Sequence, residues 1–143
     1  MLLAVSGLFG VVLSTLSAVH IYWALGGQLG LDKAVPTIDG KPAFQPGALL
    51  TLVVAGVLLG CAYVSLSLGF SHQFAMPYAH LAPYAGWALA VMFAVRAIGD
   101  FKLVGFFKKI KGSVFSTLDS TLYSPLCLVL SVGFAGLSWA AGA

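Results

Sequence analysis

The chain has 143 residues, of which 60% are hydrophobic and only 8% are charged, and it contains no Glu. Soluble domains carry about 25% charged residues, so this composition excludes an ordinary soluble domain. The formal charge of +3 comes from basic residues that flank apolar segments. Such charge orients membrane proteins and attracts anionic lipid, so it does not indicate a nucleic-acid partner.

Four apolar stretches follow one another along the chain, at residues 2–25, 47–70, 77–98 and 121–141. Each has the roughly 20 residues that an α-helix needs to cross a hydrocarbon core of about 30 Å. The alternating pattern of membrane strands is absent. The first stretch lacks the basic leader of a signal peptide, so we expect it to be retained. The sequence predicts an all-α membrane protein, a single bundle of four transmembrane helices.

The charged residues predict an orientation. All six Lys lie in the connections 26–46 and 99–120, with Arg96 at the membrane edge, and the other side of the membrane has neither Lys nor Arg. Under the positive-inside rule these two connections are cytoplasmic and both termini lie outside.

The two connections differ in character. Residues 36–42 place Asp39-Gly40 between prolines, which is typical of a tight turn or small hairpin, serving either as a connector or as a lid. Residues 101–118 mix aromatics with lysines, and Phe107, Ile110, Val114 and Leu118 share one helical face. This pattern predicts an interfacial amphipathic segment between the third and fourth spans; recognition of an anionic ligand or a partner is the alternative.

Two ionisable residues lie within the spans. His20 is about 8 Å of helical rise from the end of the first span, and Arg96 is at a similar depth in the third. Such groups normally face a bundle interior or a wet cavity, and Arg cannot lose its proton to become neutral. Asp100, four residues after Arg96, is the expected partner.

The start of the fourth span allows two interpretations. Asp119 has the position of an N-cap, with Ser120 as its rival. If the helix begins there, Pro125 leaves a carbonyl unpaired beyond the first turn. Alternatively, Ser124 is the cap and Pro125 the first helical residue, so that residues 119–123 form a broken segment, tolerated where protein or a water-lined cavity surrounds it.

These residues predict a polar pocket at the cytoplasmic end of the bundle. The candidate ligand-binding residues are His20, Tyr22, Arg96, Asp100, Asp119, Tyr123 and Ser124. The opposing interpretation is a hydrogen-bonded network that only fixes helix register.

Other features favour simpler explanations. Cys61 and Cys127 lie at different depths, so we expect free thiols and no disulfide. His72, Met76 and His80 are spaced by four, but Pro77 interrupts the spacing, so no metal site is predicted. No cofactor motif occurs. Gly56 and Gly60 form a G-x-x-x-G that would suit a homodimer.

Several segments resemble a known family. They are His-Ile-Tyr-Trp-Ala-Leu-Gly-Gly at 20–27, Arg-Ala-Ile-Gly-Asp-Phe at 96–101, Gly-Phe-Phe-Lys at 105–108 and Asp-Ser-Thr-Leu-Tyr-Ser-Pro-Leu-Cys at 119–127. Together they resemble domain-of-unknown-function family 3995, a bacterial family of small four-span membrane proteins. The resemblance covers essentially the whole chain. It implies an inner-membrane location and marks the residues above, with Trp23, Gly99 and Pro125, as positions of the family's motifs; it implies no activity.

Three functional hypotheses remain open. The first is a protein that binds or carries a small amphipathic or anionic molecule, lipid-like or isoprenoid-like, held by Arg96 and His20. The second is a membrane enzyme that uses His20 or Asp100 as acid or base and Tyr123 as a donor. The third is an accessory subunit in which the polar residues only fix packing.

Overall fold

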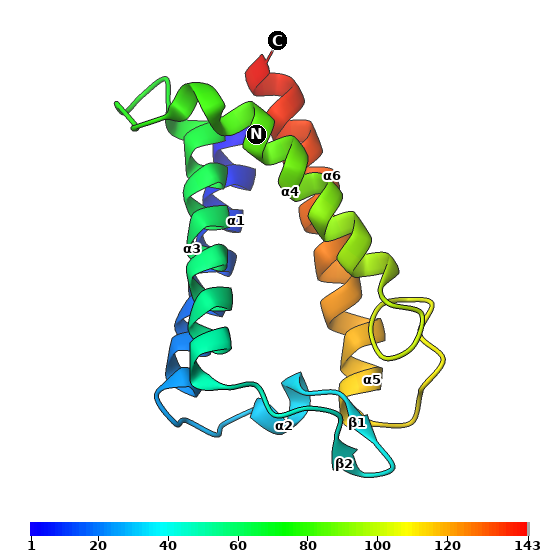
Figure 1. Ribbon diagram of the computed structural model, residues 1–143. Coiled ribbons are helices and arrows are strands. Elements are labelled where there is room, and N and C mark those ends of the chain that lie inside the picture. Colours follow the sequence, from blue (N-terminus) through cyan, green and yellow to red (C-terminus); the bar gives the residue numbers. More distant parts are fainter. Residues whose placement is uncertain (143) are drawn as a thin grey trace.

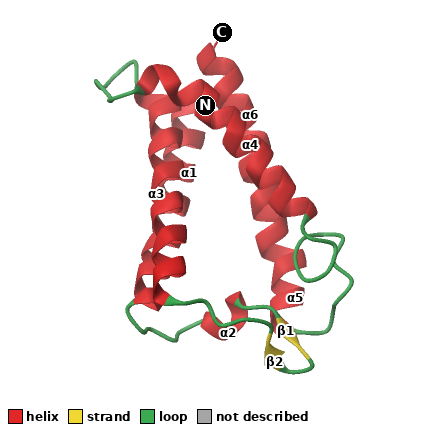
Figure 2. Ribbon diagram, viewed as in Figure 1, coloured by secondary structure: helices red, strands yellow, loops and turns green. Residues whose placement is uncertain are grey.

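The computed structural model describes residues 1–142 and contains four long helices (Figures 1 and 2). They are α1 (Leu2–Ala24), α3 (Ala48–Phe70), α4 (Ala82–Ile98) and α6 (Ser124–Gly142). A 3₁₀ turn, η1 (Ala79–Leu81), precedes α4, and α6 continues directly from α5 (Val114–Leu118) and the π turn η2 (Asp119–Tyr123). All four helical segments are long and apolar enough to cross a membrane, which confirms the predicted four-helix membrane fold.

The helices form two antiparallel hairpins, α1 with α3 and α4 with α6, which meet near the termini and diverge toward the opposite end (Figure 1). We call this opposite end the charged end, because connections 25–47 and 99–113 lie there. It also holds α2 (Leu31–Ala34) and the strands β1 (Thr37–Ile38) and β2 (Lys41–Pro42). The strands pair antiparallel, with Thr37 opposite Pro42. Asp39 and Gly40 turn the chain between them with φ of 50° and 77°, as the sequence predicted.

Serine hydroxyls join the helices within each hairpin. Ser17 Oγ donates to the carbonyl of Ala55 at 2.8 Å, and Ser65 Oγ donates to that of Ser6 at 3.0 Å. In the other hairpin Ser131 Oγ donates to the carbonyl of Ala90 at 2.7 Å. Small polar residues allow close helix contact in lipid, where no hydrophobic force drives helices together.

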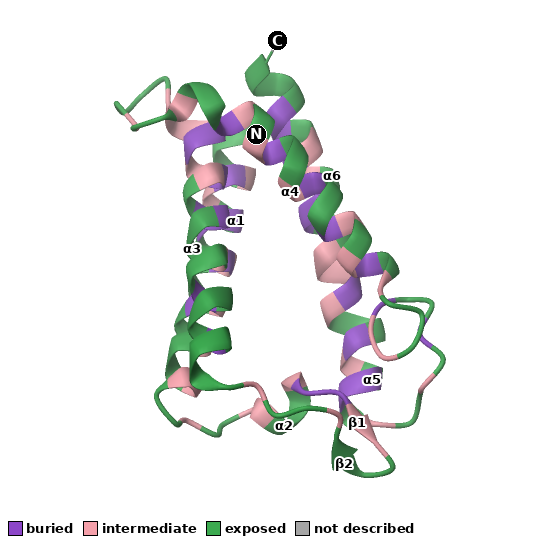
Figure 3. Cartoon of the chain, viewed as in Figure 1, coloured by how far each residue is buried: buried purple, intermediate pink, exposed green. Residues whose placement is uncertain are grey.

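The outward faces of the helices suit lipid. Residues buried in the fold line the facing sides of the hairpins, and exposed residues cover the outside (Figure 3). The exposed side chains include Leu8, Val11, Leu49 and Val132, which are 60–78% exposed. Gly56 and Gly60 also face open space, so the homodimer stays a prediction.

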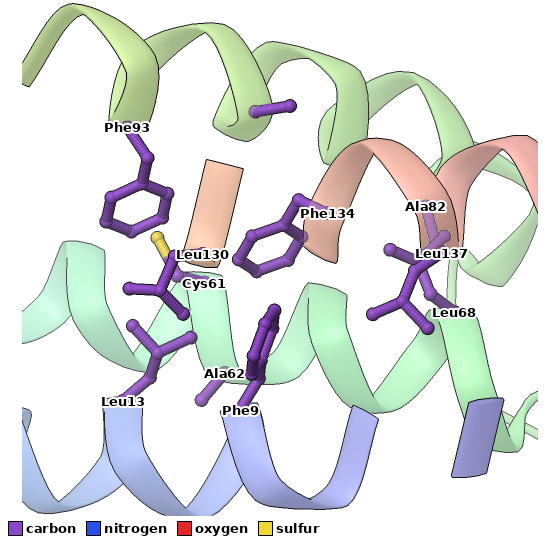
Figure 4. Packing of buried hydrophobic residues seen from close by; sticks show 11 residues of the cluster. Phe9, Leu13, Cys61, Ala62, Leu68, Ala82, Phe93, Leu130, Phe134 and Leu137 are labelled. Carbon is purple, nitrogen blue, oxygen red and sulfur yellow. The ribbon is translucent and has the colours of Figure 1, made fainter. Parts of the chain in front are cut away.

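An aromatic core closes the half of the bundle near the termini. Phe9 of α1 and Phe93 of α4 both pack against Phe134 of α6 (Figure 4). Phe93 and Phe134 are stacked, with ring centroids 5.9 Å apart. A Cβ at position 133 would clash with the ring of Phe9, so Gly133 is what allows α1 to approach α6. Close packing here leaves the other half as the place for a cavity.

The connection between α4 and α5 differs from the prediction. A continuous amphipathic helix over 101–118 is wrong: helix occurs only from Val114, with Ser113 as N-cap accepting from the Ser116 amide at 3.0 Å. Residues 99–113 form turns and bends, because Phe101, Gly105 and Gly112 have positive φ, which ends regular helix. Whether this segment lies in the membrane interface stays a prediction.

The helix start near Pro125 also differs from both interpretations. Neither Asp119 nor Ser124 is an N-cap, since helical backbone runs from Val114 through η2 into α6. Proline has no N–H for the usual bond four residues back. A π turn shifts the bonding to five residues back, and its position just before Pro125 lets the helix continue.

Candidate functional site

A cavity of about 480 Å³ lies between the two hairpins at the charged end. Its wall is mostly aliphatic, drawn from all four long helices, and its floor includes Ala34 of α2 and Phe115 of α5. Its polar lining comes from His20, Trp23, Arg96 and Tyr123, with Cys61 and Cys127 contributing thiols. The volume lies within the roughly 300–1,000 Å³ of small-molecule sites, which are typically apolar with a few polar groups.

The cavity is elongated along the bundle. On α1 its lining runs from Leu13 to Trp23, which is about 15 Å of helix at 1.5 Å per residue. That is about half of a hydrocarbon core of some 30 Å. The apolar lining lies toward the bundle centre, and the polar groups cluster at the charged end.

Asp119 is the centre of a buried ionic cluster beside the cavity. Its Oδ1 accepts from Arg96 Nη2 at 3.0 Å and from Ser124 Oγ at 3.3 Å. Its Oδ2 accepts from Lys108 Nζ at 3.0 Å and from the Gly105 amide at 2.7 Å. Asp119 and the Lys108 side chain are both fully buried. The π turn sets the direction of Asp119, so the backbone irregularity and the ionic cluster belong together.

The cluster carries excess positive charge. Arg96 and Lys108 are two cations that share the single carboxylate of Asp119, which leaves a net charge of +1. Nη1 of Arg96 is also buried with no hydrogen-bond partner among the described residues. Buried polar groups in native structures nearly always have a partner, so the cluster leaves one donor of Arg96 unsatisfied.

His20 presents one ring nitrogen to the cavity side. Its Nδ1 lies 2.7 Å from the carbonyl of Leu16, and a carbonyl can only accept, so Nδ1 carries the proton. Nε2 therefore accepts when the ring is neutral and donates when it is cationic. The ring meets Trp23 edge-on, with centroids 5.0 Å apart. No carboxylate of the described residues hydrogen-bonds to His20.

Asp100 is placed away from this cluster, and the expected Arg96–Asp100 pair is wrong. Its Oδ1 accepts from the backbone amides of Val104, Leu103 and Lys102 at 3.0, 2.7 and 2.9 Å. These bonds, that from Val104 first, lower the pKa of the Asp100 carboxyl below its ordinary value of 3.8. The helix ends at Ile98 and Gly99 has a φ of 87°, so Asp100 no longer shares a helix face with Arg96.

The remaining candidates divide between the cavity and the surface. Tyr123 lines the cavity, and its hydroxyl donates to the carbonyl of Lys33 in α2 at 3.1 Å. Ser124 lies next to the cavity lining and its hydroxyl donates to Asp119 Oδ1. Tyr22 is 47% exposed, with its ring against Gly27 and outside the cavity lining. The three residues of the enzyme hypothesis, His20, Asp100 and Tyr123, therefore do not form one site.

Sequence reasoning missed Lys108 and Gly105 as members of the cluster. Lys108 belongs to the segment predicted to be amphipathic and interfacial, where a lysine would be exposed, yet it is only 2% exposed. The segment Gly105 to Lys108 is one of those that resemble the family. That resemblance was the one sign in the sequence that these two residues matter. Cys61 and Cys127 are free thiols, as expected. Within residues 1–142 no group of three His, Cys or acidic residues could hold a metal ion.

Four apolar helices, with an ionic cluster at one end, define the class of protein: this is an integral membrane protein of four α-helical spans. A family model described as protein of unknown function (DUF3995) matches residues 13–134. The match covers most of the chain and every residue of the cluster, so the chain belongs to this family. No curated protein and no solved structure matches the chain.

Proposed function

We propose that this protein binds a small anionic amphiphile in the cavity between its hairpins. The apolar part of the ligand lies along the aliphatic lining, and its acidic head lies at Arg96. The observation that carries the proposal is the position of Arg96, which lines the polar end of an apolar cavity and belongs to a cluster of two cations with one carboxylate.

Electrostatics favours an anion at this position. A cation away from water needs a counter-charge or a full set of hydrogen bonds. Asp119 supplies one negative charge to two cations, so an acidic head would neutralise the site. His20 adds a second polar contact through Nε2, since its Nδ1 is already bonded.

A binding role fits the arrangement better than the other two hypotheses. Acid–base catalysis by His20, Asp100 and Tyr123 requires groups that approach one substrate, and Asp100 is held by backbone amides instead. A purely structural cluster would be fully paired and without a cavity, whereas Arg96 keeps one unsatisfied donor and lines a cavity.

Binding can be measured with two amphiphiles of equal chain length, dodecyl phosphate and dodecylphosphocholine, added to the protein in dodecyl maltoside. We expect dodecyl phosphate to bind more tightly, by native mass spectrometry, and to slow the alkylation of Cys127, which lines the cavity. A charge-assisted hydrogen bond contributes about 1.5–3 kcal/mol, so Arg96→Gln should weaken binding by roughly 10- to 100-fold.

Lys109→Gln is the matched control. Lys109 is an exposed cation of the connection between α4 and α5 and forms no ion pair within the described chain. It should leave the affinity unchanged, and Arg96→Lys should restore part of it. Equal binding of the two amphiphiles, or equal loss in both Gln variants, would show that Arg96 does not hold the ligand.

A further inference from the structure

We infer that the ligand is an anionic lipid of the leaflet beside the charged end, and that it enters the cavity sideways between α3 and α4. This inference rests on the proposed function and deepens it. An acidic group at this site could come from a lipid headgroup or from a water-soluble anion, and the structure favours the lipid.

The cavity opens toward lipid on one side. Val53 and Val57 of α3 and Met92 of α4 line it, yet they are 54%, 49% and 40% exposed. On the opposite side none of the lining residues of α1 and α6 is exposed: Leu13 and Leu130 are buried and the others are half-buried. Exposed apolar side chains within membrane-spanning helices face hydrocarbon, so the mouth between α3 and α4 faces the bilayer and not water.

The charged end of the cavity is closed by a strap. α2 lies across the space between the bases of the two hairpins (Figure 1). The Tyr123 hydroxyl bonds the carbonyl of Lys33 at 3.1 Å, and Trp23 Nε1 donates to the carbonyl of Leu29 at 2.9 Å. These two bonds attach the segment around α2 to both hairpins.

A second cavity, which lies against the strap, is also apolar. It has a volume of about 240 Å³ and shares His20, Trp23, Ala34 and Val54 with the first. The rest of its lining is aliphatic, aromatic or proline, with one threonine: Leu31, Val35, Phe44, Pro46, Leu50 and Thr51. A hydrated anion approaching from water would lose its hydration along this route without compensation, whereas a lipid chain is already in hydrocarbon.

Length and charge also fit a lipid of this one leaflet. The cavity extends for about half of the hydrocarbon core, with its polar groups at the charged end and its aliphatic wall toward the centre. A lipid in that leaflet has the same orientation. The whole formal charge of +3 belongs to residues 96–119, because Asp32, Lys33, Asp39 and Lys41 cancel. Cationic surfaces concentrate anionic lipid.

The test uses the full chain in nanodiscs of equal parts dioleoylphosphatidylglycerol and dioleoylphosphatidylcholine, released for native mass spectrometry. We expect one phosphatidylglycerol to remain bound to the wild-type protein. Val57→Trp and Met92→Trp, which narrow the mouth from either side, should each lower that occupancy at least fivefold. Leu59→Trp is the control, since Leu59 is 48% exposed on the same helix and lies outside the lining.

A second arm separates the two sources of the anion. Inorganic phosphate at 10 mM, roughly ten-thousandfold above a micromolar affinity, should not displace the lipid or slow the alkylation of Cys127. Displacement by phosphate, or full lipid occupancy in both mouth variants with unchanged helicity, overturns the inference. If the mouth variants bind normally while Arg96→Gln does not, the proposed function stands and only the entry route fails; if Arg96→Gln also binds normally, both fail.

Discussion

Replacing Asp119 with Asn removes the only carboxylate of the ionic cluster and is expected to destabilise the fold severely. Arg96 and Lys108 then lie close together with no counter-charge. Removing one partner of a buried ion pair costs about 3–5 kcal/mol. The figure applies best to Lys108, whose side chain is fully buried; Arg96 is 35% exposed and adds less, because solvent screens it.

Lys108→Met is the informative comparison. It removes one of two cations, keeps the chain length and leaves Arg96 paired with Asp119 in a neutral site. Replacing a buried charge with an apolar group of similar volume is far less costly than orphaning its partner. We therefore expect Lys108→Met to lose less than half of what Asp119→Asn loses. The double variant should be more stable than the sum of the two single effects predicts.

Stability can be measured by titrating SDS into dodecyl maltoside micelles while following helix content by circular dichroism. Asp100→Asn serves as the control, because Asp100 is exposed and an Asn oxygen can still accept the three amide bonds. The reasoning is refuted if Asp119→Asn unfolds at the same SDS concentration as Asp100→Asn. It is also refuted if Lys108→Met lowers stability more than Asp119→Asn does.

Three further predictions concern the α4–α5 connection. Gly105→Ala should cost at least about 1–3 kcal/mol of left-handed strain, because Gly105 has a φ of 90° and a Cβ would clash with the Ile98 carbonyl. Its control is Gly60→Ala, in open space on α3, which should be neutral or stabilise by up to about 1 kcal/mol; equal SDS midpoints for the two variants would contradict the expected strain at Gly105. The lowered pKa of Asp100 means that its stabilising contribution is complete above the ordinary pKa of 3.8 and is lost as pH falls through the lowered value. Exchange of the Val104 amide should accelerate at that acidic end, and Asp100→Asn should abolish the acceleration. A spin label at Phe107→Cys, in a background without the native cysteines, should report headgroup depth by power saturation; accessibility typical of bulk water would contradict interfacial placement.

The sequence predicted those parts of the fold that depend on hydropathy and length. Four apolar stretches of about 20 residues admit few arrangements in a bilayer, so the helices could be placed within a few residues. The cost of ionisable groups in hydrocarbon also drew attention to His20 and Arg96. Both residues line the cavity, as that argument expects.

The choice of partner for Arg96 could not be predicted in the same way. Asp100 is four residues away and Asp119 is twenty-three, so local spacing favoured the wrong carboxylate. The outcome depends on Gly99, which turns the chain at the end of α4 with a φ of 87°, and on the π turn that directs Asp119 inward. Neither conformation leaves a periodic hydrophobic pattern in the sequence that would predict it. Lys108 is buried because both conformations bring Asp119 and the α4–α5 connection together.

The two cations of the cluster should have separate roles. Lys108 Nζ has three acceptors, the Gly105 carbonyl, Asp119 Oδ2 and Ser120 Oγ, at 3.0, 3.0 and 2.6 Å, and an ammonium has three donors. Lys108 is therefore fully satisfied, and Arg96 is the cation of the cluster that lines the cavity. It follows that Lys108→Met should lower stability and, by making the site neutral, weaken the preference for dodecyl phosphate over dodecylphosphocholine only in part, because Arg96 remains in the cavity lining. Arg96→Gln should abolish that preference at a smaller cost in stability, because the neutral Lys108–Asp119 pair remains. If both variants lose stability and preference in the same proportion, the cluster acts as one unit and this division is wrong.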